Sequence, residues 1–252
     1  MLLQHVSLVC DDWEYAPGDA MSYLNAKNST LSPEQALGEV AAPNDEEIEV
    51  GETLRDLARG QAVRDHQFDK IFPEPIRVAS PMHWTPVDVA RRAAALFDVG
   101  PKTHVLDIGS GAGKFCMVAA LTSPGTYTGV EQRPHLVQMT RSLVSRYNIP
   151  RVTFLNAGME EIDWTRFTGF YLYNPFIEHL YEKSERIDHH LDFSVERYML
   201  QVRFVQAKLT LLPIHTSILT YHGFGGEMPP YYEVTLRERG GDDYLVLWER
   251  TR

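Results

Sequence analysis

The chain has 252 residues, of which 44% are hydrophobic and 23% charged, so it is long enough to bury a substantial core and has an ordinary globular composition. Its formal net charge of −10 gives a phosphate backbone little to hold, which argues against strong nucleic-acid binding. The two cysteines, Cys10 and Cys116, offer neither a disulfide framework nor zinc-ligand spacing, and they fit a cytoplasmic location.

The negative charge is concentrated at the N-terminal end. Residues 1–80 contain 15 acidic and 6 basic side chains, whereas residues 81–252 are nearly balanced. We therefore expect two parts, an acidic and mainly helical leader or lid over 1–80 and a second domain over 81–252. No stretch approaches the roughly 20 apolar residues of a membrane helix, and residues 1–10 lack the basic start of a signal peptide.

The leader shows few regular patterns. Residues 1–30 carry enough aromatic and aliphatic side chains to dock on another surface, and residues 31–51 have the composition of an exposed acidic loop with a short helix at 33–39. Residues 52–71 have apolar side chains at mostly helical spacing. Three prolines then predict a break in regular structure, at Pro73, Pro75 and Pro81.

From residue 86 onward, helical and strand patterns alternate. Helices are predicted at 86–97, 114–121, 134–147 and 193–212. Strands are predicted at 103–108, 127–131, 151–156, 169–174 and 217–222, followed by a hairpin of 231–237 and 244–249. The expected fold class is α/β: a doubly wound, mostly parallel seven-stranded sheet with a C-terminal antiparallel hairpin and an N-terminal, mainly helical extension.

A glycine-rich turn follows the first predicted strand. Asp107 precedes glycines at 109, 111 and 113, and Glu131 ends the next strand eighteen residues after Gly113. At such a turn the backbone can approach a nucleoside, while the distant acid accepts hydrogen bonds from ribose hydroxyls. A P-loop is excluded because Phe115 stands where a magnesium-binding hydroxyl is needed. A pyrophosphate would be repelled by Asp107, whose charge suits a cationic ligand.

This pattern resembles the first motif, D-x-G-x-G-x-G, of the class I S-adenosylmethionine (SAM) methyltransferases. The resemblance covers residues 81–252 and implies a SAM-dependent methyltransferase with a Rossmann-like domain. It implies that Asp107 and the glycine turn hold the methionine end of the cofactor and that Glu131 binds the ribose. We expect Ser110 and Gln132, which adjoin these motifs, to belong to the same site. The alternative is a Rossmann-like domain whose glycine turn binds no ligand.

Two further segments are candidates for cofactor contacts. Several amino-methyltransferases have an aromatic-Thr-Pro segment before the first strand, so Thr85 is expected to bond the cofactor carboxylate or, alternatively, only to cap the next helix. Many relatives hold the adenine with an Asp after the third strand, which this chain lacks. Backbone N–H groups of Gly158 and Met159 are the candidates for that role, with Met159 also packing on the ring.

The candidate catalytic residues are Asn174, Pro175 and Phe176. They end the fourth predicted strand, and ligands of open α/β sheets bind outside the carboxyl ends of the strands. Asn174, which would also contact the cofactor, and a nearby carbonyl would accept N–H bonds from an amine, and Phe176 would stack on a base or contact an alkylammonium group. The segment resembles the [D/N/S]-P-P-[Y/F] motif of amino-methyltransferases with one proline missing. An asparagine-led segment also occurs in non-SET histone lysine methyltransferases. A simple capped turn is the alternative.

Glu178 and His179 are candidates for accepting a proton from the acceptor. Together with His189 and His190 they match no common metal-ligand spacing, and we expect no metal.

The sequence thus predicts a SAM-dependent methyltransferase that acts on a nitrogen acceptor, with a slight preference for a protein side-chain amine and no membrane partner. An RNA or DNA base N-methyltransferase, a small-molecule methyltransferase and a non-catalytic SAM-binding subunit remain as alternatives.

Overall fold

The computed structural model describes residues 43–97, 100, 102–188 and 191–252. The expectations for residues 1–42, including the short helix at 33–39, and those for His189 and His190 lie outside the described residues. Among the described residues, no helix combines the length and the apolar character that crossing a membrane requires.

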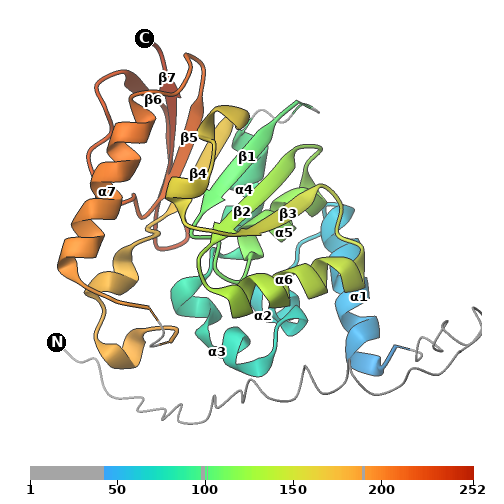
Figure 1. Cartoon of the computed structure of the whole chain (residues 1–252). Coiled ribbons are helices and arrows are strands. Elements are labelled where there is room, and N and C mark those ends of the chain that lie inside the picture. The colour runs from blue at the N-terminus through green and yellow to red at the C-terminus, as the bar shows by residue number, and fades with distance from the viewer. Residues whose placement is uncertain (1–42, 98–99, 101, 189–190) are drawn as a thin grey trace, which may run out of the picture. The chain divides into compact units, whose positions relative to one another are not determined.

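A seven-stranded sheet forms the centre of the fold (Figure 1). Its strands are β1 (His104–Ile108), β2 (Thr126–Glu131), β3 (Val152–Asn156), β4 (Gly169–Tyr173), β5 (Ser217–Tyr221), β6 (Tyr232–Gly240) and β7 (Asp243–Arg250). They lie in the order β3-β2-β1-β4-β5-β7-β6. The first five strands are parallel, and β7 pairs antiparallel with both β5 and β6. The predicted fold class is confirmed.

Helices cover both faces of this sheet. They are α1 (Asp45–Ala58), α2 (Asp65–Phe68), α3 (Glu74–His83), α4 (Val87–Leu96), α5 (Lys114–Thr122), α6 (Pro134–Tyr147) and α7 (Val195–Leu209). Five short 3₁₀ turns lie between them, η1 (Asp69–Ile71), η2 (Met159–Glu161), η3 (Trp164–Arg166), η4 (Ile177–Leu180) and η5 (Lys183–Glu185).

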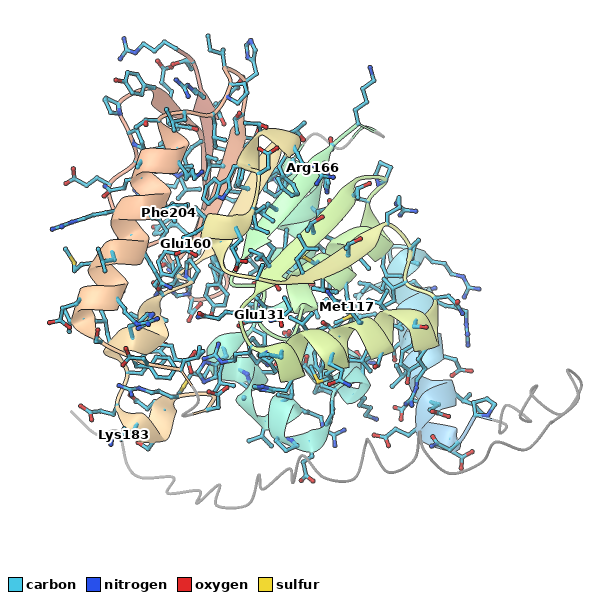
Figure 2. All side chains as sticks on the ribbon, in the orientation of Figure 1. Met117, Glu131, Glu160, Arg166, Lys183 and Phe204 are labelled. Atoms are coloured by element: carbon cyan, nitrogen blue, oxygen red, sulfur yellow. The ribbon has the colours of Figure 1, made fainter. Side chains whose placement is uncertain are left out.

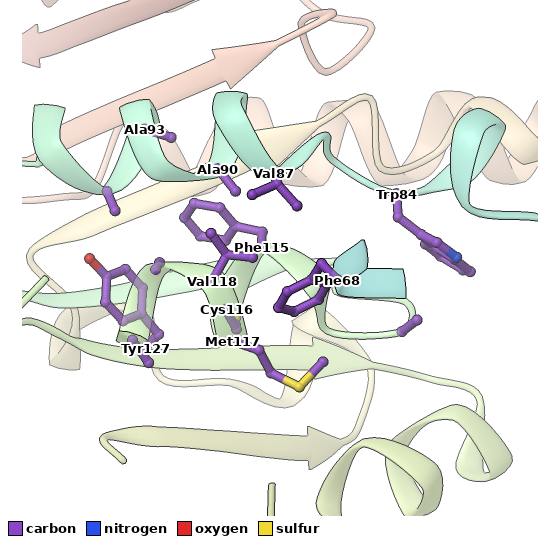
Figure 3. Close-up of a cluster of buried hydrophobic side chains, with 14 of the residues drawn as sticks. Phe68, Trp84, Val87, Ala90, Ala93, Phe115, Cys116, Met117, Val118 and Tyr127 are labelled. Atoms are coloured by element: carbon purple, nitrogen blue, oxygen red, sulfur yellow. The ribbon is translucent and has the colours of Figure 1, made fainter. Parts of the chain in front are cut away.

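Two buried clusters lie on opposite faces of the sheet because successive strand side chains point in opposite directions. On β4, Tyr171 belongs to the cluster that α4, α5 and α6 cover, whereas Phe170 and Leu172 belong to the cluster that α7 covers. Both clusters are apolar, which explains why the parallel strands read as nearly continuous hydrophobic runs. Figure 3 shows part of the first cluster, including Phe115 of α5.

The proline-rich segment before residue 84 contains a helix, so the predicted break is wrong. Helix α3 has Pro75 in its first turn, where a missing N–H costs no helical hydrogen bond. Pro81 lies inside α3 but only two residues before the helix ends at His83. The predicted helix at 52–71 is divided, because α1 ends at Ala58 and α2 begins only at Asp65.

Residues 43–80 and residues 81–252 belong to one compact unit, which extends from Pro43 to Arg252. Val50 and Leu54 of α1 and Phe68 of α2 are buried in the same cluster as the apolar residues of α5. Figure 3 shows Phe68 beside α5. The predicted division of the chain at residue 80 therefore does not coincide with a break in packing.

Candidate cofactor and acceptor site

The glycine turn docks on the carboxyl end of β2 through its backbone. The N–H groups of Gly109 and Ser110 both donate to the Val130 carbonyl, each at 3.0 Å. The Gly111 N–H donates to Oε2 of Glu131 at 3.1 Å. The predicted turn and the predicted acid are therefore in direct contact.

Gly111 allows an indole ring to lie on the turn. Its φ is +53°, and a Cβ atom added there would stand 2.2 Å from Cζ3 of Trp84. The indole is itself fixed, because its N–H donates to the Ile76 carbonyl at 3.2 Å and its side chain is buried. Only glycine satisfies both the backbone conformation and the contact.

We expect Gly111→Ala to reduce affinity for SAM and its demethylated product, S-adenosylhomocysteine (SAH), at least about tenfold, because the turn or Trp84 must move. Gly60→Ala is the matched control. Gly60 has a φ of +79° but nothing within 4 Å of the added Cβ, so it reports backbone strain alone. Isothermal titration of both variants measures the effect, and equal losses of affinity would contradict the role of the Trp84 contact.

A cavity of about 540 Å³ opens at the carboxyl ends of the strands. Of the residues predicted for the site, those that line it are Gly109, Gly111, Glu131, Gln132, Gly158, Met159, Asn174, Pro175 and Phe176. Four predicted residues lie behind its wall, namely Thr85, Asp107, Ser110 and Gly113. Glu131 and Glu160, which also lines the cavity, are labelled in Figure 2.

Glu131 is buried, and the backbone orients both of its carboxylate oxygens. Oε2 accepts from Gly111, and Oε1 accepts the Arg133 N–H at 2.9 Å. Burial raises the pKa of Glu131, and the Arg133 charge and these two N–H donors oppose that rise. Each oxygen has a second lone pair, so the carboxylate can also accept bonds from a ligand in the cavity.

Asp107 lies beneath the turn rather than on the cavity surface. It is buried, and its Oδ2 accepts a weak bond from the Cys116 thiol at 3.4 Å. Burial raises the pKa of Asp107 to about 7, and the nearby Glu131 charge adds to the rise while the thiol opposes it. The turn therefore lies above two buried carboxyl groups, a favourable place for a cation.

Two predicted contacts are occupied by the protein itself. The Thr85 hydroxyl is 3.1 Å from the Tyr171 hydroxyl in the buried core, so it is not directed at the cavity. The Gly158 N–H donates to the Glu161 carboxylate at 2.7 Å. The predicted use of that N–H for the adenine ring would require this bond to break.

Ser110 and Gly113 do not line the cavity. The Ser110 hydroxyl is buried and makes no hydrogen bond within the described residues. A Cβ atom on Gly113 would lie 2.4 Å from Cζ of Phe154, so this glycine lets the start of α5 approach β3 closely.

The Asn174 segment lies against the glycine turn. A Cβ atom on Gly109 would stand 3.1 Å from Cβ of Pro175, which shows how closely the ends of β1 and β4 approach. Asn174 has a φ of +39°, a conformation that asparagine tolerates, and its N–H donates to the Gly223 carbonyl at 2.9 Å. Within the described residues its side-chain amide makes no hydrogen bond. Phe176 is mostly buried but still contributes to the cavity wall.

Neither candidate proton acceptor is free in this arrangement. Glu178 accepts bonds from the Arg133 guanidinium at 2.5 Å and from the Ile187 N–H at 2.6 Å. Nδ1 of His179 accepts the Ser194 N–H at 3.3 Å, which leaves Nε2 to donate to Gln201 at 2.8 Å. Burial lowers the pKa of His179. His179 does not line the cavity, so its surroundings indicate a structural role.

Other cavity residues were absent from the sequence prediction. Tyr173 ends β4 and His222 directly follows β5. Asp242 in the β6–β7 turn accepts bonds from the Tyr221 hydroxyl at 2.5 Å and from His222 at 3.2 Å. The rule that parallel strands present their carboxyl ends at one edge could have identified Tyr173 and His222. No sequence signal indicated Asp242, because it reaches the cavity through an antiparallel hairpin.

No group of three or more His, Cys, Asp or Glu side chains is arranged to hold a metal ion in the part of the chain that the structure describes.

A family model described as a methyltransferase domain matches residues 100–176. An RNA methyltransferase from Salinibacter ruber, solved in complex with S-adenosyl-L-homocysteine, aligns with a TM-score of 0.50 and 20% identity over 67% of this chain and 94% of that chain. TrmN from Thermus thermophilus aligns with a TM-score of 0.50 and 18% identity, over 68% of this chain and only 51% of that chain. No curated protein sequence matches the chain. At these identities the two structures show a shared fold.

Proposed function

We propose that this chain, a class I SAM-dependent methyltransferase, transfers the methyl group of SAM to a nitrogen atom positioned beside Asn174. The methyltransferase assignment rests on the family match over residues 100–176, on the sheet order and on the glycine turn. The choice of nitrogen rests on the acceptor side of the cavity.

The cavity fits the cofactor in size and in charge. Its volume lies within the roughly 300–1,000 Å³ that is usual for small-ligand sites. The Glu131 carboxylate is oriented for the two ribose hydroxyls, Gln132 lies beside it, and Met159 offers an apolar surface for the adenine. Asp107 and Glu131 provide negative potential near the positively charged sulfonium and ammonium groups. When bound, the cofactor supplies an already activated methyl group, so the protein contributes mainly orientation.

The Asn174 amide is the observation that carries the nitrogen assignment. It lines the cavity at the end of β4, one residue from the Pro175–Gly109 contact, and its oxygen is available to accept an N–H. An amine held by that oxygen has its lone pair directed away from Asn174. Because β1 and β4 are neighbours in the sheet, Asn174 lies beside the glycine turn that follows β1.

The charges of the cavity favour an amine over a phosphate-rich acceptor. Its acidic lining residues are Glu131, Glu160, Glu178 and Asp242. The one arginine among the lining residues, Arg133, already contacts three carboxylates. The rings of Tyr173 and Tyr181 also line the cavity and suit contact with a cation. We therefore propose a protein side-chain amine as the acceptor.

Asn174→Ala should lower the rate of methyl transfer about 100-fold or more while SAH affinity changes less than about fivefold, because the amide acts on the acceptor. Asn174→Asp is the informative companion, since it keeps an acceptor oxygen but cannot reproduce the amide. Titration calorimetry and initial rates measure the two effects. A parallel loss of SAH binding would move Asn174 from the acceptor side to the cofactor side.

The acceptor class is tested by incubating the enzyme with methyl-tritiated SAM and a cell extract. We expect the label in protein, stable to mild alkali as N-methyl groups are and methyl esters are not. Nuclease-sensitive label would instead identify RNA or DNA as the acceptor. Label confined to small solutes would identify a small-molecule methyltransferase.

A further inference from the structure

Arg133 lies at the centre of a buried group of carboxylates. Its Nη2 is 2.5 Å from Glu178, its Nε is 2.9 Å from Asp188, and its Nη1 is 3.6 Å from Glu131. The Arg133 side chain is only 7% exposed, and its three partners are between 4% and 13% exposed. Burial lowers the pKa of Arg133, but the three carboxylates more than offset this effect, so the guanidinium stays charged.

These contacts join the two sides of the cavity. Glu131 ends β2 on the cofactor side. Arg133 lies two residues later and is the last residue before α6. Glu178 lies in η4, on the segment that leaves Asn174 and forms the acceptor side. Glu178 also accepts the Ile187 N–H, so one carboxylate connects η4 to the chain nine residues later.

The acceptor side has little regular structure of its own. Between Asn174 and α7 the described chain contains only the short turns η4 and η5. The Arg133 guanidinium also lies 5.9 Å from the centre of the Phe193 ring, on the last part of that segment. Arg133 therefore contacts this segment at three points, Glu178, Asp188 and Phe193.

We infer that Arg133 is a positioning residue that holds the acceptor side of the cavity, residues 174–188, in register with the cofactor acid Glu131. The inference rests on the proposed function, because it takes Glu131 as the ribose contact and Asn174 as the acceptor contact. Ligand hydroxyls on Glu131 add to the two N–H bonds that already hold this carboxylate, and through Arg133 they further restrict Glu178 and Asp188. Cofactor binding thus organises the surface that receives the acceptor.

Loss of the Arg133 guanidinium should affect the two sides of the cavity differently. Without the guanidinium, Glu131 keeps its bonds from the N–H groups of Gly111 and of residue 133 itself. Glu178 and Asp188, in contrast, lose their closest cation while remaining mostly buried. The variant Arg133→Met should therefore retain cofactor binding and lose the organisation of the acceptor side.

The test combines SAH titration with hydrogen exchange of residues 177–188. In the unmodified enzyme, saturating SAH should slow exchange there about tenfold or more. In Arg133→Met the protection should fall below about twofold, with SAH affinity within about tenfold of the original. The rate of tritium transfer into extract protein should fall about 100-fold. Arg197→Met is the control, because Arg197 forms an exposed pair with Asp192 near the same segment.

Two further variants make the result decisive. Glu178→Ala removes the contact of Arg133 with η4 and keeps Arg133 paired with Glu131 and Asp188, so the SAH-dependent protection of residues 177–180 should fall even if Arg133→Met fails to fold. Arg133→Lys, which can reach fewer of the carboxylates, should be intermediate. Full SAH-induced protection of residues 177–180 in Glu178→Ala, or of residues 177–188 in a folded Arg133→Met, would overturn the inference. If the unmodified enzyme binds no SAH, the proposed function itself fails.

Discussion

At pH 8, Asp107→Asn is expected to be more stable than the unmodified protein, by up to about 4 kcal/mol in the free energy of unfolding. The cause is the burial of Asp107, which raises its pKa from the ordinary 3.8 to about 7 in the folded state. At pH 8 the folded protein must hold a carboxylate without solvent, whereas an amide of nearly the same shape carries no charge. Urea unfolding of both proteins measures the difference.

The size of this stability difference depends on pH in a defined window. Because the pKa of Asp107 is higher in the folded state, that state binds more protons than the unfolded chain between about pH 4 and pH 7. The contribution of Asp107 to stability is therefore lost as the pH rises through this window. The advantage of Asp107→Asn should be largest above pH 7 and should vanish near pH 4. An advantage that is constant across this range would show that desolvation of the charge is not the cause.

The same substitution should weaken binding of the cofactor. At pH 8, Asp107→Asn removes one of the two buried negative charges beneath the turn, and we expect SAM affinity to fall about 10- to 100-fold. SAH, which lacks the sulfonium charge, should lose less. The affinity of the unmodified protein for SAM should rise between pH 6 and pH 8, and that of the variant should stay flat. Unchanged SAM affinity in the variant would remove Asp107 from the cofactor site.

Lys114→Met is expected to destabilise the protein by about 3–5 kcal/mol, because it leaves the buried Asp69 carboxylate, and the half-exposed Asp65, without their cation. The Lys114 ammonium is almost fully buried and lies 2.7 Å from both Asp65 and Asp69, and 3.0 Å from the Ser80 hydroxyl. A cation in the first turn of a helix is unfavourable for the helix dipole, so α5 gains nothing from it. The gain lies in the contact with α2, η1 and α3.

Lys70→Met is the matched control, since Lys70 pairs with Glu49 at the surface and its loss should cost less than about 1 kcal/mol. Burial already raises the pKa of Asp69, although Lys114 opposes the rise. In Lys114→Met the Asp69 carboxyl should therefore bind a proton more readily, and the deficit in stability should shrink as the pH falls. Similar urea midpoints for the two lysine variants would mean that residues 65–80 are not joined to the glycine turn through this cluster.

Much of the fold was accessible from local sequence patterns. Helix α6 has the predicted bounds, because Pro134 favours its first turn and Asn148 takes the left-handed conformation, with a φ of +50°, at its end. The parallel strands were predicted to within one residue at each end, since short apolar runs bounded by turns are a local signal. Helix α3 was missed because the prolines obscured its pattern, whereas its support comes from tertiary contacts, with η1 and between Ser80 and Lys114.

Taken alone, the sequence determined the strand-turn-helix-strand unit on which the proposed cofactor site rests. The distance from Asp107 through the three glycines to Glu131 is set by one strand-turn-helix-strand unit, and within such a unit spacing along the chain dictates position in space. The tertiary structure alone decided which side chains surround that unit. Trp84 on Gly111, the acids around Lys114, and Glu178 and Asp188 on Arg133 come from segments 27 to 55 residues away. Periodicity within a segment carries no information on such pairings, because they arise only when the helices pack on the sheet.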